Sequence, residues 1–348
     1  MSQEYSDFSA RLYEKTFRAR VPSHGHFELT FRCALKCGFC YCSCYTGPEH
    51  AGRELATPEV LRILDEAAAG GCLWMTFSGG DPFIRPDFRK IYDHALDLGM
   101  IVSIFCSGLL MTDEWLEHLK ATQPLKIELP LYGVTAETYE AVAGRSHTFG
   151  PAVRNIRKML AAGLPVKLKT KITRGNLHET GLIRDFVEKE LGLEFFPNYY
   201  LYPRLDGSRV HLSDRLSVQE IVQLERVFTF DSCDSGTEAM ASMSDPRLFR
   251  CAAGVNSFYI NPWGELNFCT YVREGSWDLR KGSISDGVAA LRNHLLSRSH
   301  AAESACGSCK IQSSCQNCPG HAVLETGELG GRSEYLCSVN HGLNGVHS

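Results

Sequence analysis

Short apolar segments alternate with amphipathic segments six times between residues 27 and 203, and this alternation constrains the fold more than any other feature. Segments rich in β-branched and aromatic residues predict strands, and segments with apolar residues three and four positions apart predict helices. The first helix has Thr57 as its N-cap and Gly70 near its end. Strands joined by helices pair in parallel through right-handed crossovers. The predicted strands are 27–33, 73–80, 101–108, 125–133, 166–173 and 193–203, and the predicted helices are 57–71, 85–99, 112–122, 148–163 and 176–192.

The number of repeats favours an α/β fold built on a partial (β/α)6 TIM-like barrel. Six units are fewer than the eight of a closed barrel, although periodicity alone does not separate an open barrel from a doubly wound sheet. The pattern breaks near Arg204, and one amphipathic helix is expected at 215–228. After Cys251 the chain is rich in Gly and Cys and has little helical periodicity, so we expect a small hydrophobic core and folding energy from metal ligation.

Four regions are therefore expected. They are an N-terminal helical extension at 1–24, the partial barrel at 25–205, a linker with one helix at 206–250, and a Cys-rich domain at 251–348.

Composition restricts the location and the partners. The net charge of −4 and the isoelectric point near 6.4 give no basic signal, so nucleic acid is not expected as a partner. No apolar run approaches the roughly 18 residues of a membrane span, and the N-terminus lacks the apolar stretch of a signal peptide. We therefore expect a cytoplasmic protein without membrane contact.

Fifteen cysteines in a reducing compartment predict metal ligation instead of disulfides. They fall into two groups and three single residues. The first group is Cys33, Cys37, Cys40, Cys42 and Cys44; the second is Cys251, Cys269, Cys306, Cys309, Cys315, Cys318 and Cys337; the single residues are Cys72, Cys106 and Cys233.

Three cysteines of the first group form a C-x3-C-x2-C pattern directly after the first predicted strand. They are Cys33, Cys37 and Cys40, and a loop at this point lies at the C-terminal mouth of the sheet, where α/β active sites form. Three thiolates suit three irons of a [4Fe–4S] cube and leave the fourth iron open, which indicates a catalytic cluster. A zinc site or a redox-inert cluster is the alternative.

With an aromatic residue before its last cysteine, Cys33–Cys37–Phe39–Cys40 resembles the signature of radical S-adenosylmethionine (radical SAM) enzymes. The resemblance implies that SAM chelates the open iron and that cluster reduction releases a 5′-deoxyadenosyl radical, which abstracts hydrogen from a C–H bond. It also implies an electron donor such as flavodoxin or ferredoxin.

A second motif, SGGDP at Ser78–Pro82, ends the second predicted strand. It resembles the family's Gly-Gly-Glu-Pro turn, which binds the SAM amino group, with Asp81 in place of Glu. The resemblance extends more loosely to the ends of later strands. The implied cofactor-binding residues are Phe39, Ser78, Gly79, Gly80, Asp81, Ser107 with Gly108, Arg145, and Thr170 with Thr173.

The second cysteine group resembles the SPASM domain of peptide-modifying radical SAM enzymes, which holds two auxiliary [4Fe–4S] clusters. Its signals are C-x2-C-x5-C-x2-C and a Gly264-x4-Cys269 stretch that ends a predicted hairpin. The inner cluster lacks a fourth nearby cysteine, so either Cys233 reaches it or one iron is open. A zinc ribbon is the alternative. The resemblance assigns Cys306, Cys309, Cys315 and Cys337 to an outer cluster and Cys251, Cys269 and Cys318 to an inner one.

The function that we expect is maturation of a ribosomally made precursor peptide by crosslinking, epimerisation or excision. Cys42 and Cys44 are candidate catalytic thiols that donate hydrogen, and Cys72 and Cys106 are further spare thiols. About 24 residues precede the first strand, too few for a winged-helix recognition domain, so a separate peptide-recognition protein is expected.

Three alternatives remain open. One is formylglycine formation in sulfatases, with Asp231, Asp234 or Asp245 as general base. Another is a non-peptide substrate such as a tetrapyrrole side chain. The third is a non-enzymatic iron–sulfur electron carrier.

Overall fold

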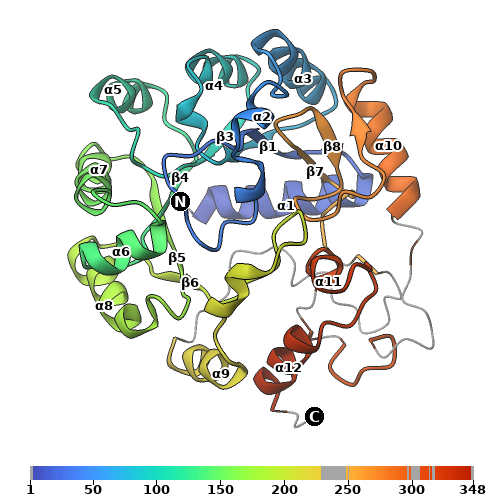
Figure 1. The fold of residues 1–348 in the computed structure, drawn as a ribbon. Coiled ribbons are helices and arrows are strands. Elements are labelled where there is room, and N and C mark those ends of the chain that lie inside the picture. Colours follow the sequence, from blue (N-terminus) through green and yellow to red (C-terminus); the bar gives the residue numbers. More distant parts are fainter. Residues whose placement is uncertain are drawn as a thin grey trace.

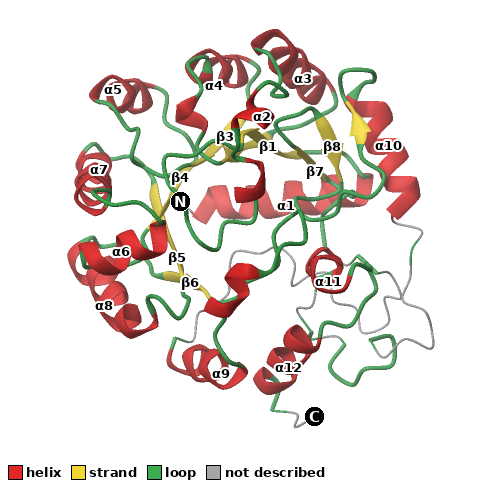
Figure 2. Cartoon of the chain, in the orientation of Figure 1, coloured by secondary structure: helices red, strands yellow, loops and turns green. Residues whose placement is uncertain are grey.

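The computed structural model describes residues 3–228, 248–249, 251–295, 298, 306–312, 314–315 and 318–345. A curved sheet of nine strands runs through this part of the chain in the order β6-β5-β4-β3-β2-β1-β7-β8-β9, and helices line its convex side (Figures 1 and 2). The sheet ends at β6 and β9, so the partial, open barrel is confirmed.

The six predicted strand–helix units are present, with shorter elements than predicted. All six strands pair in parallel. The strands are β1 (His24–Thr30), β2 (Trp74–Gly79), β3 (Ile101–Phe105), β4 (Lys126–Pro130), β5 (Val166–Lys171) and β6 (Phe196–Asn198). The helices between them are α2 (Pro48–Ala51), α3 (Thr57–Ala69), α4 (Phe88–Asp97), α5 (Asp113–Ala121), α6 (Ala136–Ala143), α7 (Phe149–Ala161) and α8 (Thr180–Asp185).

Alternation along the strands separates an apolar helix-facing side from a polar concave side. On β1, Phe27 and Leu29 are buried in the core against Ile63 of α3, whereas His26 and Glu28 face the other way. We call this concave side, to which His26 and Glu28 point, the lumen. The apolar residues of β1, such as Phe27 and Leu29, pack against the helices. The alternate positions face the lumen and can therefore be polar or charged.

The C-terminal segment builds more core than its sequence predicted. Strand β7 (Ser257–Ile260) pairs in parallel with β1, and β8 (Glu265–Asn267) forms the predicted hairpin with β7. Phe258, Ile260 and Leu266 belong to the same core as the barrel strands. The expectation of a small core was therefore wrong, because the free edge of β1 gives these short strands a place to pair.

Helices also occupy this segment, where little helical periodicity was recognised. α10 packs beside α3, with Ile284 and Leu291 in the core. The remaining elements are α1 (Gln3–Ala19), which confirms a helical N-terminus, α9 (Val218–Val227), β9 (Trp277–Asp278), α10 (Ile284–Leu295), α11 (Pro319–Thr326) and α12 (Glu334–Leu343). In the described part of the chain, every helix is too short or too polar to span a bilayer.

Candidate metal centres and active site

The first cysteine loop begins where β1 ends, at the mouth of the lumen. Burial raises the pKa of Cys33 to about 12, and the charge on Cys40 contributes. Burial also raises the pKa of Cys37, with further contributions from Cys40 and Cys33. The three sulfurs therefore lie within electrostatic range of one another, and Cys37 Sγ is 3.9 Å from the Tyr132 hydroxyl.

Helix α6 holds this loop through backbone contacts. The amide of Lys36 donates to the carbonyl of Ala143 at 2.9 Å, and Gly144 ends the helix with φ of 65°. A Cβ on Gly144 would lie 2.1 Å from the carbonyl oxygen of Lys36, so a side chain is excluded there. This unpredicted helix therefore fixes the backbone between the first two cysteines.

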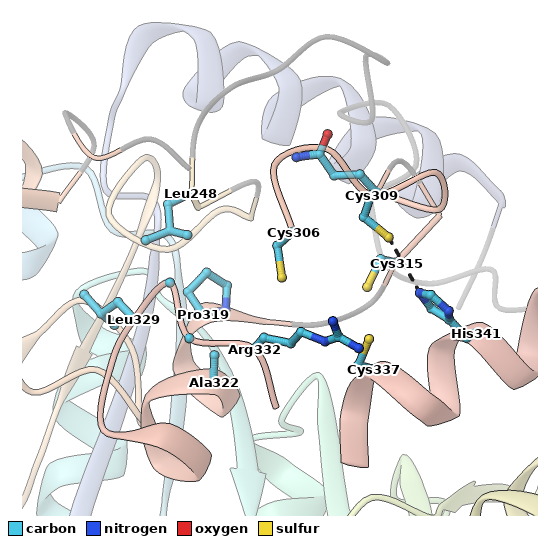
Figure 3. A pocket seen from close by; sticks show the side chains of 13 residues that line it. Leu248, Cys306, Cys309, Cys315, Pro319, Ala322, Leu329, Arg332, Cys337 and His341 are labelled. Atoms are coloured by element: carbon cyan, nitrogen blue, oxygen red, sulfur yellow. Dashed lines mark hydrogen bonds between the residues drawn. The ribbon is translucent and has the colours of Figure 1, made fainter. Parts of the chain in front are cut away.

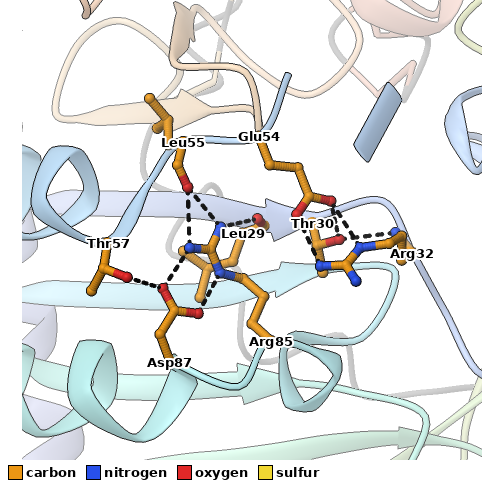
Figure 4. A network of polar contacts seen from close by, with 8 residues as sticks. All are labelled: Leu29, Thr30, Arg32, Glu54, Leu55, Thr57, Arg85 and Asp87. Atoms are coloured by element: carbon orange, nitrogen blue, oxygen red, sulfur yellow. Dashed lines mark hydrogen bonds and ion pairs between the residues drawn. The ribbon is translucent and has the colours of Figure 1, made fainter. Parts of the chain in front are cut away.

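An arginine network anchors the strand end beside the loop (Figure 4). Arg85 donates to the carbonyls of Leu29 and Leu55, each at 3.1 Å, and its guanidinium binds Asp87. Thr57, at the start of α3, also donates to Asp87 at 2.6 Å. Because the buried guanidinium joins the end of β1 to the start of α3, both ends of the cysteine-bearing connection are held in place.

The SGGDP turn packs tightly against the same loop. A Cβ on Gly79 would lie 2.0 Å from the carbonyl oxygen of Thr30, and a Cβ on Gly80 would lie 2.2 Å from that of Arg32. Both glycines are therefore needed for the approach of β2 to the cysteine loop, whatever ligand binds there.

Asp81, the acid of this turn, is fully buried and faces neighbouring protein groups. Its Oδ2 accepts from the amide of Ser107 at 3.1 Å and from the Ser107 hydroxyl, and its Oδ1 accepts from the amide of Phe83 at 3.0 Å. Burial raises the pKa of Asp81, and these hydrogen bonds oppose the rise. Two predicted cofactor residues, Asp81 and Ser107, thus bind each other across the ends of β2 and β3.

The other predicted cofactor residues are dispersed around the loop. Ser78 hydrogen-bonds the ring of His26 in the lumen, and the Phe39 ring packs edge-on against Tyr132 at 5.2 Å. The exposed Arg145 donates to the carbonyl of Ala34, inside the cysteine loop, at 3.0 Å. Phe39 and Arg145 therefore lie in or against the cysteine loop, and the cofactor-binding role of these residues stays a prediction.

Thr170 does not face the lumen. It shares the parity of Val166 and Leu168, which are buried in the helix-facing core, and it is 1 % exposed. Thr173, in the turn after β5, is also buried, and its amide is bonded to Asn176. We had expected Thr170 at the cofactor, and strand parity turns its side chain away from that side.

The two candidate catalytic thiols lie in different surroundings. Cys42 is 1 % exposed, packs against Phe31 and Trp263, and its sulfur is 3.5 Å from that of Cys40. Cys44 is half-buried in the short 3₁₀ helix Ser43–Tyr45. The two thiols therefore occupy separate positions.

The predicted inner cysteines come together beneath α11. The charge on Cys318 contributes to raising the pKa of both Cys251 and Cys269, after burial. A Cβ on Gly320 would lie 3.5 Å from the sulfurs of Cys269 and Cys318. Cys233, the candidate fourth ligand, lies outside the described residues, as do the candidate bases Asp231, Asp234 and Asp245.

The four predicted outer cysteines line one cavity of about 110 Å³ (Figure 3). Cys306, Cys309 and Cys315 approach it from one side, and Cys337 projects from α12 on the other. His341, one helical turn after Cys337, places its Nε2 atom 3.6 Å from the sulfur of Cys309. Sequence reasoning missed His341, although its spacing of four from Cys337 places both on one helix face.

In the described residues, no group of three His, Cys, Asp or Glu side chains is close enough to hold a single metal ion. A [4Fe–4S] cube binds one thiolate per iron, so its ligands surround a space instead of converging on one point. The outer set has this arrangement, because its four cysteines line one cavity.

Aromatic residues that sequence reasoning missed connect the first loop to the inner set. The Tyr41 ring is 6.1 Å from that of Tyr271, which is 5.0 Å from His321. Tyr41 also donates from its hydroxyl to the buried Glu28, as does Tyr259. Burial raises the pKa of Glu28, and this buried acid lies between the barrel and the C-terminal segment.

Lysines dominate the lumen face of β4 and β5. Lys126 and Lys169 both bind the carboxylate of Glu128, at 2.8 and 2.5 Å. Lys171 donates to Asn198 and to the Tyr200 carbonyl, and burial lowers its pKa to about 7. Sequence reasoning missed Lys171. The alternation of lysines with other residues along β5 could have indicated that its side chain faces the lumen.

Comparison with known families identifies the barrel. Residues 27–180 match the model of the radical SAM superfamily. These residues therefore form a radical SAM domain. Its cysteine loop and SGGDP turn lie within the matched residues.

Three curated relatives resemble this chain. PqqA peptide cyclase of Granulibacter bethesdensis is 38% identical over 150 residues, which are 43% of this chain and 40% of the relative. AdoMet-dependent heme synthase of Methanosarcina barkeri is 25% identical over 87% of this chain and 92% of the relative. Mycofactocin maturase MftC of Mycobacterium tuberculosis is 29% identical over 83% of this chain and 76% of the relative.

The fold is similar to a solved structure. Streptococcus suis SuiB bound to precursor peptide SuiA superposes with a TM-score of 0.68 at 16% identity, over 97% of this chain and 82% of SuiB. At this identity the likeness extends to the fold alone, and that fold includes the C-terminal segment beyond the barrel.

Proposed function

We propose that this protein is a radical SAM maturase of a ribosomally made precursor peptide. The observation that carries the proposal is a loop of three cysteines at the mouth of a polar lumen, together with two further cysteine sets gathered in the C-terminal segment. The first set supplies three thiols, and Tyr41 and Tyr271 lie between it and the inner set. Relatives named as a peptide cyclase and a maturase support the peptide substrate.

The donor sets fit the cofactors that such an enzyme needs. Cys33, Cys37 and Cys40 would hold the [4Fe–4S] cluster that binds SAM. When bound, the two groups together supply a 5′-deoxyadenosyl radical that abstracts hydrogen from the substrate. The auxiliary clusters would be held by the inner set, Cys251, Cys269 and Cys318, and by the outer set, Cys306, Cys309, Cys315 and Cys337.

The chain's own residues prepare the lumen for this chemistry. Backbone contacts from α6 and the two glycines hold the cysteine loop against the strand ends. The hydroxyls of Tyr41 and Tyr259 bind Glu28, which keeps a buried acid in the lumen wall. An electron donor of the flavodoxin or ferredoxin type and a separate peptide-recognition protein complete the proposal.

A tetrapyrrole substrate is the second candidate. It is favoured by the heme synthase relative, whose alignment covers 92% of that protein. The two candidates predict different products, because a peptide retains its modification in a mass spectrum and a tetrapyrrole changes its visible absorbance.

The test is turnover by the anaerobically reconstituted protein with SAM and dithionite. We expect 5′-deoxyadenosine, and a mass change in a precursor peptide encoded beside the gene. A crosslink removes about 2 Da, which is two hydrogen atoms. Cleavage of SAM with no change in any such peptide, together with altered porphyrin absorbance, would favour the second candidate.

A further inference from the structure

Arg273 is a half-buried residue with two buried side-chain nitrogens that have no bonded acceptor among the described residues. It lies four residues after Cys269, and its Nε and Nη2 atoms have no hydrogen-bond partner in the part of the chain that the structure describes. A guanidinium offers five N–H donors in a rigid fork. Leaving such donors buried and unpaired is strongly unfavourable, so this geometry indicates a place for an acceptor that the described residues do not supply.

Two aromatic rings, one from the barrel and one from the C-terminal segment, lie next to the guanidinium. Its central carbon is 5.3 Å from the Tyr45 ring and 5.9 Å from the Trp263 ring. Tyr45 follows the first cysteine loop, and Trp263 lies in the β7–β8 turn. Stacking on these rings fixes the position of Arg273 without using its N–H groups.

The carboxyl group within electrostatic range does not occupy these donors. Arg273 acts on Glu28 through space, but the oxygens of Glu28 already accept from Tyr41 and Tyr259. Burial raises the pKa of Glu28 and so favours its neutral form. Among the described residues, Arg273 therefore has no bonded counter-charge.

The lumen walls reinforce the positive charge. Lys126 and Lys169 share the single carboxylate of Glu128, and Lys171 donates to the neutral oxygens of Asn198 and Tyr200. On this face of β4 and β5 the three lysines therefore lie beside one carboxylate. Such a surface favours an anionic partner.

We propose that Arg273 binds a carboxylate of the precursor peptide, either an acidic side chain or its terminal carboxylate, through its unpaired Nε and Nη2 donors. A carboxylate matches this fork in a bidentate arrangement. The inference rests on the proposed function, because it names the substrate chemistry that the same site recognises.

The test compares two small probes, N-acetyl-glutamate methylamide and N-acetyl-glutamine methylamide. Both have blocked, uncharged termini, and they differ only in whether the side chain is a carboxylate or a neutral amide. Their dissociation constants are measured by titration calorimetry or saturation-transfer NMR on the reconstituted protein with saturating SAM. We expect the acidic probe to bind at least about tenfold more tightly, as for hydrogen bonds to charged groups. Arg273→Met should abolish this preference, and Arg273→Lys should keep part of it.

Arg18→Met is the matched control, because Arg18 is exposed on α1 and paired with Glu14. It should leave the preference unchanged. Equal binding of the two probes to the natural protein, or an unchanged preference in both Arg273 variants, would overturn the inference. Competition of the acidic probe with SAM, with weaker SAM binding by Arg273→Met, would instead assign Arg273 to SAM and also overturn it.

The experiments distinguish failure of this inference from failure of the proposed function. A protein that makes 5′-deoxyadenosine but shows no preference for the acidic probe retains the proposed function and loses only this inference. A protein with no SAM cleavage loses the proposed function.

Discussion

The carboxylate of Asp81 binds Ser107 twice, through the backbone amide at 3.1 Å and through the hydroxyl. Because Asp81 ends the SGGDP turn after β2 and Ser107 follows β3, this pair joins two neighbouring strand ends at the mouth of the lumen. The other oxygen of Asp81 accepts from the amide of Phe83. The acid of the motif therefore organises the protein turn before any ligand is bound.

Asp81→Asn should destabilise the protein by about 1–3 kcal/mol. Each carboxylate oxygen faces a backbone N–H, so either orientation of the amide places its NH2 group against a donor. Anaerobic denaturant unfolding of the cluster-free protein measures the change. An Asn variant as stable as the natural protein would show that these hydrogen bonds do not organise the turn.

Gly80→Ala should prevent correct assembly of the first cysteine loop. Its Cβ would lie 2.2 Å from the carbonyl oxygen of Arg32, and overpacking of this kind costs about 1–3 kcal/mol or more. Gly38→Ala is the matched control inside the loop, because a Cβ there meets nothing within 4 Å. We expect reduced iron uptake for the first variant and normal uptake for the second; equal uptake contradicts this explanation.

Spacing along the chain predicted the parallel strand–helix units, whereas the family resemblance was needed to divide the cysteines of the C-terminal segment into two sets. Six strand–helix units require parallel pairing, and the intervals between cysteines restrict which thiols meet. Alternation also placed Thr170 with Leu168 on the helix-facing side, a signal that the resemblance of Thr170 to ribose-binding positions overrode.

Lys171 gives a pH-dependent stability. Burial lowers its pKa from 10.5 to about 7 in the folded protein, so between these values the unfolded chain binds more protons, and stability rises with pH. The part of the free energy of unfolding that depends on Lys171 is therefore largest above pH 10.5, and it decreases as pH falls toward 7.

Lys171→Met should remove this slope, which is at most about 1.4 kcal/mol per pH unit. The free energy of unfolding of the variant minus that of the natural protein should therefore decrease between pH 7 and pH 10. The comparison is made by denaturant titration of both proteins across this range. A difference that is independent of pH would show that the Lys171 ammonium is not desolvated.

Cys42→Ala should lower stability by about 1 kcal/mol through a small cavity, because the thiol packs against Phe31 and Trp263. It should leave SAM cleavage intact, since Cys40 remains as the ligand. Cys44→Ala should leave both properties intact. Peptide product that disappears in either variant, while 5′-deoxyadenosine is still formed, would instead assign hydrogen donation to that thiol.

The parts that could not be predicted depend on contacts between distant segments. Strand β7 is only four residues long, and its stability comes from the free edge of β1. The position of Arg273 depends on Tyr45, which is remote in sequence, as well as on Trp263. No local pattern marks such relationships, because each residue alone is compatible with an ordinary surface position.

The most direct test of the central claim is 5′-deoxyadenosine formation by the anaerobically reconstituted protein. With three clusters of four irons, it should bind about 12 irons per chain and cleave SAM under dithionite. Cys33→Ala should abolish cleavage and leave about eight irons in the auxiliary sets. A natural protein that binds about 12 irons but forms no 5′-deoxyadenosine would contradict the account.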